Sequence, residues 1–320
     1  MHLPRMIAAG LMLIAAFNAV GQSYPERPVR AVVPFPPGGG TDIIARMLLQ
    51  RIAQRIGGSF VIDNRAGAGG TIGTEIVAKA PPDGYTILLA SSSHTINPGV
   101  YKKIGYDPAR DFAPVSLIAA GPGLLVVHPS VAAHSVKELI TVAKSKPGQL
   151  NYASAGNGTP PHLSAELFKS MAGIEMVHVP YKGNTLAFVD LLAGTVSLSF
   201  PTITSGLPPV RSGKLRALGV TSRQRSSVVP EVPTIAEAGL PGYEATTWYG
   251  MLAPASTAAA IVHKLQSQVE EVLRQPDTRE KLLAQGLEPV GNKPAEFSAI
   301  IAAELVKWNR IVAAAGVKAE

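Results

Sequence analysis

The sequence predicts an α/β protein of two lobes, each built on a mostly parallel sheet flanked by helices. From Val29 onward, short β-branched runs alternate with amphipathic stretches of helical period, which is the pattern of βα units. The pattern starts again at Asn151, after a long apolar stretch that contains Gly121, Pro122 and Gly123. The chain has 320 residues, more than the roughly 250 at which single cores stop growing, so two domains are expected.

The amino-terminal segment has the layout of a secretory signal peptide. Arg5 precedes the apolar run from Met6 to Val20, and small residues follow it. That run is shorter than the roughly 20 residues that span a bilayer. We therefore expect cleavage after Gly21, with Ser23 as the alternative. Because the chain has no cysteine, it offers no thiol for lipid attachment, disulfides or metal. The expected product is a periplasmic monomer that is not inserted in a membrane.

The first lobe is predicted to contain three strands that end in Gly-rich or Ser-rich loops. The first strand, VRAVVP, is followed by the loop FPPGGGTD and the helix IIARMLLQRIAQRI. The second strand, FVIDN, is followed by the loop RAGAGGTIG and the helix TEIVAKA. The third strand, YTILLA, is followed by the loop SSSHTINP. In the first helix, apolar residues recur every four positions along one face. Loops that follow parallel strands gather at one edge of a sheet, so we expect these three to meet at a common site.

The second lobe is predicted from four further strands and the loops between them. The strands are NYASA, MVHVP, VSLSF and LRALGVTS, and the loops after the first three are GNGTPPH, YKGN and PTITSG. The run ATTWYGMLAP is expected to return the chain to the first lobe. We therefore expect a signal peptide at 1–21, lobe one at 22–124 and 249–320, and lobe two at 125–248. A ligand cleft should lie between the lobes, beside two crossing strands.

Two glycine-rich loops, one in each predicted lobe, indicate anion binding. Residues 38–42 lie between the first strand and its helix, with Thr41 or Asp42 expected as the N-cap, and residues 156–159 occupy the matching position in lobe two. Helix N-termini present unpaired N–H groups and partial positive charge, and glycine lets a ligand approach the backbone closely. The two loops would suit one carboxylate between the lobes. Tight turns with ordinary caps are the alternative for either loop alone.

Several functional classes are excluded or left unsupported. The phosphate-loop and dinucleotide glycine patterns are absent, as are GxSxG and HExxH. The histidines form no i,i+4 pair, so no metal or cofactor is expected, although His94 and His162 lie beside the candidate loops. Charged residues make up only 16% of the chain and form no dense basic stripe, which disfavours nucleic acid. A net charge of +7 favours anionic ligands, or it belongs to a merely solvated basic surface.

The sequence resembles the Bug (Bordetella uptake gene) receptors of tripartite tricarboxylate transporters. The matching segments, in order over nearly the whole mature chain, are VPFPPGGGTDIIAR, NRAGAGGTIG, DGYTILLASSSHTINP, YASAGNGTPPHLSAELF, VPYKG, SGKLRALGVTS, VPTIAEAGLPGYE and WYGMLAP. The resemblance implies a type II periplasmic (Venus-flytrap) binding protein, not an enzyme, that captures a small carboxylate for membrane permease subunits. It also implies ligand contacts from Phe35, Gly38, Gly39, Thr41, Ser91 and Ser92 in lobe one, and from Gly156, Gly158, Thr159, Lys182 and Gly183 in lobe two.

The chain departs from the family pattern after the strand VSLSF. Many relatives have an acidic residue where this chain has Phe200, Pro201 and Thr202. An acid there could pair with a ligand ammonium group, so its absence disfavours amino acids and leaves neutral or aromatic carboxylates, with Thr202 as a further expected contact. Two other functions stay open from the sequence. One is a sensor that presents ligand to a receptor kinase, and the other is a hydrolase with an unrecognised Ser/His pair.

Overall fold

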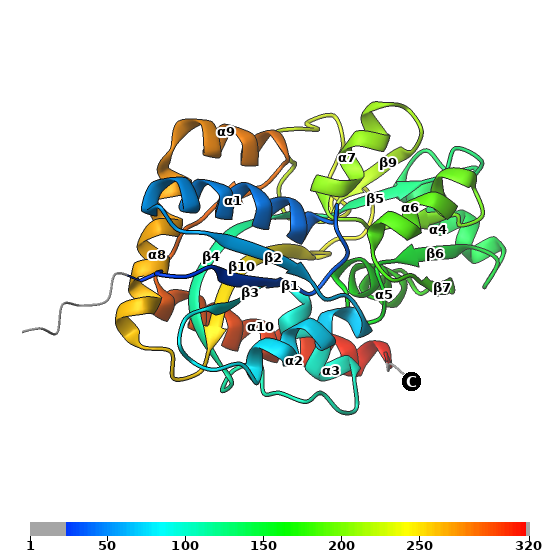
Figure 1. Ribbon diagram of the computed structural model, residues 1–320. Coiled ribbons are helices and arrows are strands. Elements are labelled where there is room, and N and C mark those ends of the chain that lie inside the picture. Colours follow the sequence, from blue (N-terminus) through cyan, green and yellow to red (C-terminus); the bar gives the residue numbers. More distant parts are fainter. Residues whose placement is uncertain (1–23, 318–320) are drawn as a thin grey trace, which may run out of the picture.

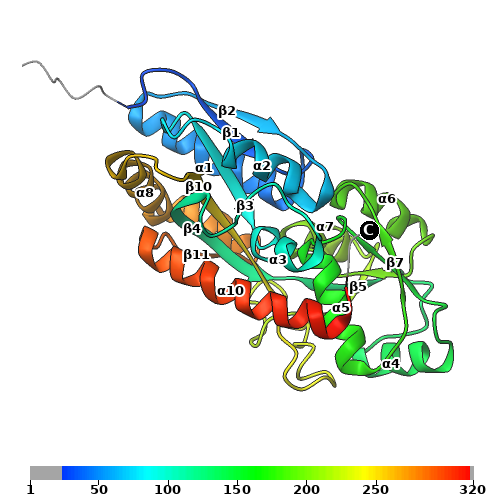
Figure 2. The same ribbon diagram turned by 90° about the horizontal axis from the view of Figure 1, so that it is seen from below.

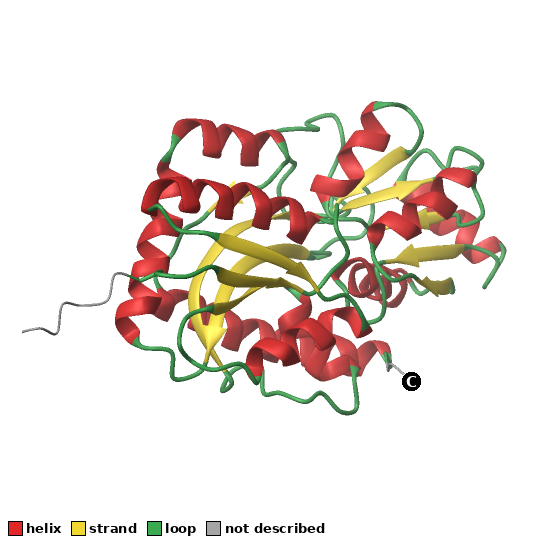
Figure 3. Ribbon diagram, in the orientation of Figure 1, coloured by secondary structure: helices red, strands yellow, loops and turns green. Residues whose placement is uncertain are grey.

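The computed structural model describes residues 24–317. The expected signal peptide and its cleavage after Gly21 therefore lie outside the described residues. Two sheets lie side by side, each with helices around it (Figures 1 and 3). Among residues 24–317, no helix has both the length and the apolar character needed to cross a membrane.

The first sheet has six strands in the spatial order β11, β4, β10, β3, β1, β2. Strands β1 to β4 run in one direction, and β10 and β11 run against them. The strands are β1 (Val29–Val33), β2 (Phe60–Asn64), β3 (Thr86–Ser91), β4 (Phe112–Pro122), β10 (Thr246–Pro254) and β11 (Glu288–Pro289). The helices around it are α1 (Gly40–Ile56), α2 (Thr71–Ala78), α3 (Ser93–Val100), α8 (Ala259–Arg274), α9 (Pro276–Ala284) and α10 (Pro294–Ala315), with a short 3₁₀ turn at Ala68–Gly70.

Apolar side chains cover both faces of this sheet, as expected for strands with helices on either side. Ala31 and Val33 belong to the same core cluster as Leu48 of α1. Val32 points to the other face and belongs to the cluster that contains Val77 of α2. The successive residues of β1 thus alternate between two cores, which fixes the position of the loop that follows β1.

The second sheet has five strands in the order β7, β6, β8, β5, β9. Strand β5 alone among them runs against the other four. The strands are β5 (Leu124–Val127), β6 (Asn151–Ser154), β7 (Val177–Pro180), β8 (Leu198–Ser199) and β9 (Arg216–Val220), and the helices are α4 (Val136–Ser145), α5 (Pro160–Ala172), α6 (Asn184–Ala193) and α7 (Ile203–Arg211). The predicted α/β class, with helices around each sheet, is confirmed. Both sheets are mixed and not mostly parallel, because β10 and β11 in the first sheet and β5 in the second run against their neighbours.

The chain crosses between the sheets at two adjacent places. Strand β4 passes into β5 through Gly123, whose N–H donates to the Thr221 hydroxyl at 2.7 Å. Thr221 in turn donates its N–H to the Gly123 carbonyl, and its own carbonyl accepts from Ala245 just before β10. The long helix α10 extends from beneath the first sheet to α5, as Figure 2 shows, and Trp308 near its end lies in the second core.

Candidate functional site

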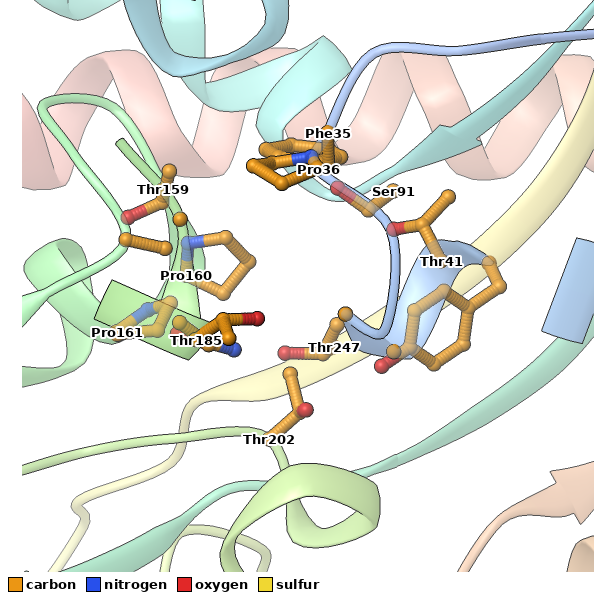
Figure 4. Close-up of a pocket in the computed structure, with 16 residues that line it drawn as sticks. Phe35, Pro36, Thr41, Ser91, Thr159, Pro160, Pro161, Thr185, Thr202 and Thr247 are labelled. Atoms are coloured by element: carbon orange, nitrogen blue, oxygen red, sulfur yellow. The ribbon is translucent and has the colours of Figure 1, made fainter. Parts of the chain in front are cut away.

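A cavity lies between the two sheets, where the loops after several of their strands meet (Figure 4). We use lobe one for the part of the chain built on the first sheet and lobe two for the part built on the second. We call it the interlobe cavity. It contains about 460 Å³ of empty space, open solvent at its mouth included. Its lining residues are Phe35, Pro36, Gly39, Gly40, Thr41, Ser91, Ala155, Thr159, Pro160, Pro161, Gly183, Asn184, Thr185, Thr202, Thr247 and Tyr249. None of these described residues has a charged side chain, and eight have a hydroxyl or amide group.

Four helices, α1, α5, α6 and α7, begin at this cavity. None of them has a side chain that caps its first N–H groups. Each helix start adds about half a positive charge. Pro160 and Pro161 occupy the first two positions of α5 and have no N–H, so α5 adds its dipole, whereas α1 and α6 also add donors. The cavity is therefore electropositive without any lysine or arginine in its wall.

The expectation that Thr41 or Asp42 caps α1 is wrong. Gly39 occupies the N-cap position. The Asp42 carboxylate instead accepts hydrogen bonds from the Gly38 N–H at 2.9 Å, from Arg46 at 2.9 Å and from Asn64 at 3.0 Å. Burial alone would raise the pKa of Asp42, but these donors outweigh it and lower the pKa. The carboxylate is thus neutralised within lobe one, and the Thr41 hydroxyl is left at the cavity.

Loop 154–159 in lobe two is held by hydrogen bonds within the lobe and by one to lobe one. The Thr159 hydroxyl donates to the Gly156 carbonyl at 2.6 Å, and the Gly158 N–H donates to His162 Nδ1 at 3.2 Å. From lobe one, the Tyr101 hydroxyl donates to the Asn157 carbonyl at 3.0 Å. The loop therefore forms both a wall of the cavity and a point of contact between the lobes.

Two stacked histidines lie beneath this loop. The rings of His162 and His178 are nearly parallel, with centroids 4.1 Å apart. Burial lowers the pKa of His162 to about 4, and burial together with the neighbouring His162 lowers the pKa of His178 to about 3. Ser154 Oγ lies 2.7 Å from His178 Nε2, but Ser154 is fully buried, so this Ser/His pair has no access to a substrate. His94 is also buried, bonds the Pro108 carbonyl, and has a pKa lowered by burial to about 4.

The structure brings most of the expected site residues together. Seven of the twelve line the interlobe cavity: Phe35, Gly39, Thr41, Ser91, Thr159, Gly183 and Thr202. Gly156 and Lys182 line an adjoining side cavity, which shares Phe35 and Gly183 with the first. Gly38, Ser92 and Gly158 line neither. The Gly38 N–H donates to the Asp42 carboxylate, and the Gly158 N–H donates to His162 Nδ1. Ser92 Oγ accepts a hydrogen bond from the backbone N–H of Trp248 at 2.8 Å.

The chain segment at the family's acidic position divides between core and cavity. Phe200 is buried in the core of lobe two, with its ring centroid 5.5 Å from that of Phe168. Thr202 lies two residues later, at the N-cap of α7, and lines the cavity. Thr202 is thus the residue of this segment that lines the cavity.

Sequence reasoning missed the residues that strand β10 places at the cavity. Thr247 and Tyr249 lie two positions apart on β10, so they share one face of the sheet. Tyr249 is the register partner of Ser91 at the end of β3. Thr185, in the first turn of α6, was also missed, although its position after a glycine at a helix start was a usable signal. Within residues 24–317, no group of three His, Asp or Glu side chains could hold a metal ion.

Comparison with known proteins gives one consistent result. A family model described as "Tripartite tricarboxylate transporter family receptor" matches residues 44–317. Protein BugT of Bordetella pertussis (strain Tohama I) is 38% identical, with 99% of each chain covered. The structure of R. palustris Rpa4515 with adipate is similar at 41% identity and a TM-score of 0.90, covering 92% of this chain and all of that one. MatC from Rhodopseudomonas palustris with bound malate is similar at 33% identity and a TM-score of 0.86, covering 90% of this chain and all of that one.

Proposed function

Because this chain belongs to the tripartite tricarboxylate transporter receptor family, we propose that it captures a small carboxylate in the interlobe cavity and presents it to membrane permease subunits. Membership in the family confirms the predicted resemblance to Bug receptors, the type II binding-protein fold, and a binding role in place of catalysis. The periplasmic location is part of the proposal, and a monomeric state remains a prediction.

The observation that carries the proposal is the set of four helix starts around a cavity whose described lining has no charged side chain. A carboxylate in such a place would be held by backbone N–H groups and hydroxyls, which form stronger hydrogen bonds to an ion than to a neutral group. A cation would meet four partial positive charges and no acid. The same reasoning disfavours amino acids, since no carboxylate faces the cavity to pair with an ammonium group. The adipate and malate of the two similar structures are both acids of the proposed class.

Closure of the lobes completes the proposal. We take residues 22–124 and 249–320 as lobe one and 125–248 as lobe two, which would rotate about the paired crossings near Gly123 and Ala245. The bond from Tyr101 to Asn157 would form as the lobes approach each other. A ligand that contacts both lobes would then stabilise the closed form, which is the form proposed to bind the permease.

The test is a binding panel that separates charge from shape. Thermal-shift and calorimetric titrations would compare dicarboxylates, hydroxy acids, monocarboxylates and aromatic acids with the carboxamide of each acid. We expect at least one acid to bind, and a ligand at about 100 times its Kd to stabilise the protein by about 2.7 kcal/mol. The carboxamides should bind much more weakly. The proposal fails if no acid binds, if carboxamides bind equally well, or if an amino acid binds more tightly than its deaminated analogue.

A further inference from the structure

One peptide group in loop 154–159 is held from both lobes. Its carbonyl, which belongs to Asn157, accepts a hydrogen bond from the Tyr101 hydroxyl of lobe one at 3.0 Å. Its N–H, which belongs to Gly158, donates to His162 Nδ1 of lobe two at 3.2 Å. This peptide is planar and trans, so its N–H and its carbonyl point in opposite directions. Whatever fixes the direction of the N–H therefore also aims the carbonyl.

The neighbouring hydrogen bonds of the same loop stay within lobe two. The Gly156 N–H donates to Ser154 Oγ at 3.1 Å, and the Thr159 N–H donates to the Gly156 carbonyl at 3.3 Å. Among the described residues of this loop, the peptide between Asn157 and Gly158 is thus the one that hydrogen bonds join to both lobes. It is the point at which the geometry of lobe two acts on the contact with lobe one.

Glycine leaves the orientation of this peptide to be selected by its partners. Gly158 has φ 71°, and glycine enters negative φ about as readily. Turning the peptide over would make its carbonyl face His162 Nδ1 and its N–H face the Tyr101 hydroxyl. The first of these contacts would bring two acceptors together. The acceptor on His162 thus selects the orientation in which the carbonyl faces lobe one.

The ring that supplies this acceptor is fixed in place and uncharged. His178 lies parallel to His162, with ring centroids 4.1 Å apart and planes 6° apart. His178 is itself held by Ser154 Oγ at 2.7 Å from its Nε2, and the Tyr152 ring stacks on it with a centroid distance of 4.8 Å. Burial lowers the pKa of His162 to about 4, so at neutral pH the ring carries one proton. That proton is on Nε2, because Nδ1 accepts the Gly158 N–H.

We propose that His162 is a positioning residue for closure of the lobes, because it holds the N–H of one peptide and so aims the carbonyl of that peptide at Tyr101. The stacked His178 keeps the ring of His162 in the required direction. Neither histidine touches the ligand in this role. The inference rests on the proposed function, since the contact matters for binding only if the lobes close around a ligand.

Three substitutions of His162 separate the acceptor from the ring. Asparagine keeps an acceptor on Cγ, where Nδ1 is attached, glutamine carries the same amide one methylene farther out, and phenylalanine keeps a flat ring without an acceptor. Calorimetric titration uses the acid of the binding panel that the wild type binds most tightly, beginning with adipate and malate. We expect His162→Asn to retain most of the affinity. His162→Gln and His162→Phe should weaken it by about 2- to 12-fold, as for one neutral hydrogen bond.

A double-mutant cycle with Tyr101→Phe separates positioning from a general loss of stability. In the Tyr101→Phe background, the three His162 variants should bind with nearly equal affinity, because the carbonyl has no donor left to meet. The control is Tyr243→Phe, which removes a hydrogen bond to the Ser164 carbonyl within lobe two and should leave the effect of His162→Phe on affinity unchanged. Urea unfolding checks that each variant is folded during titration. Since glutamine and phenylalanine both remove the acceptor, either variant that folds completes the cycle.

Three results would overturn the inference. The first is wild-type affinity in both His162→Gln and His162→Phe. The second is an affinity that His162→Phe keeps and His162→Asn loses, which would assign the effect to the ring. The third is a loss that persists unchanged in the Tyr101→Phe background. In each case an acid still binds the wild type, so the proposed function stands, whereas both fail if no acid of the panel binds the wild type.

Discussion

A methyl group at Gly69 should act as a wedge between the lobes. Gly69 lies in the loop after β2, in the left-handed conformation with φ 62° and ψ 17°. A Cβ there would collide with the carbonyl oxygen of Asn157 in lobe two, and it would stand 3.0 Å from the Tyr101 hydroxyl. The Gly69 carbonyl also accepts a hydrogen bond from the Asn97 side chain at 3.2 Å, which opposes movement of the loop away from Asn157.

The cost of Gly69→Ala has two parts that can be separated. The left-handed backbone costs an alanine about 1–2 kcal/mol in any arrangement of the lobes. The collision costs about a further 1–3 kcal/mol, typical of overpacking, and only when the lobes touch. Gly57 is the matched control, since it has φ 66° and ψ 17° and nothing lies within 4 Å of its added Cβ. Both variants should lose similar stability, but only Gly69→Ala should weaken ligand binding, by about 5- to 150-fold.

The assay pairs urea unfolding of each unliganded variant with calorimetric titration of the tightest-binding acid from the panel. Unfolding reports the shared backbone strain, and titration reports the cost of closure. Equal affinities for Gly69→Ala and Gly57→Ala would refute the idea that the contact between these loops forms with ligand binding. Weaker ligand binding by Gly57→Ala than by Gly69→Ala would refute the same idea, because residue 57 has no contact across the lobes.

Three further predictions follow from single contacts. Tyr101→Phe removes a neutral hydrogen bond between the lobes and should weaken ligand binding by about 2- to 12-fold. The control is Tyr243→Phe, which acts within lobe two and should lower only the urea midpoint. The prediction is contradicted if Tyr243→Phe weakens binding and Tyr101→Phe lowers only the urea midpoint. Thr159→Val deletes the buried hydrogen bond to the Gly156 carbonyl and should lower the free energy of unfolding in urea by about 1–3 kcal/mol. Thr159→Ser keeps the hydroxyl and should retain most of that free energy. Equal losses in the two variants would show that the hydrogen bond does not stabilise the protein. His94 and the two stacked histidines have folded-state pKa values lowered to about 4 or below from an ordinary 6.5. The unfolded chain therefore binds more protons in this window, and stability should fall as pH decreases from 6.5 toward 4, by up to about 1.4 kcal/mol per pH unit for each histidine. Urea midpoints that stay level between pH 6.5 and about 5, above the range where most carboxylates titrate, would argue against neutral buried histidines.

Local sequence signals were sufficient for the parts of the site at the starts of α1 and α5, although they did not lead to Thr185 at the start of α6. The spacing of Gly39 and Thr41 after β1, and of Thr159 before two prolines, follows from turn and helix chemistry within a few residues. These positions were therefore expected at a ligand site before any tertiary contact was considered, and the structure places all three at the interlobe cavity. The βα alternation likewise predicted the strands, because its period depends only on neighbouring residues.

The sequence could not predict what depends on pairing between distant segments. Tyr249 lies in the apolar run TWYGML, which by itself indicates a buried strand, and its hydroxyl reaches the cavity only through the register of β10 against β3. The N-cap of α1 was misassigned for a related reason. Aspartate is a common N-cap residue, so Asp42 was a reasonable candidate. Its carboxylate instead accepts a hydrogen bond from Asn64 on β2, which is more than a helix length away in sequence.

The place of β10 in the first sheet also constrains the order in which the chain can fold. Strand β10 lies between β3 and β4, so those two strands join one sheet only when the segment Thr246–Pro254 pairs with both of them. A chain that emerges with its amino end first can pair β1 with β2 and β3, and can pair β5 to β9, before β10 is available to join β3 to β4. Pairing over such a long sequence separation is slow. The architecture thus delays completion of the first sheet until the segment Thr246–Pro254, far along the chain, is available to pair.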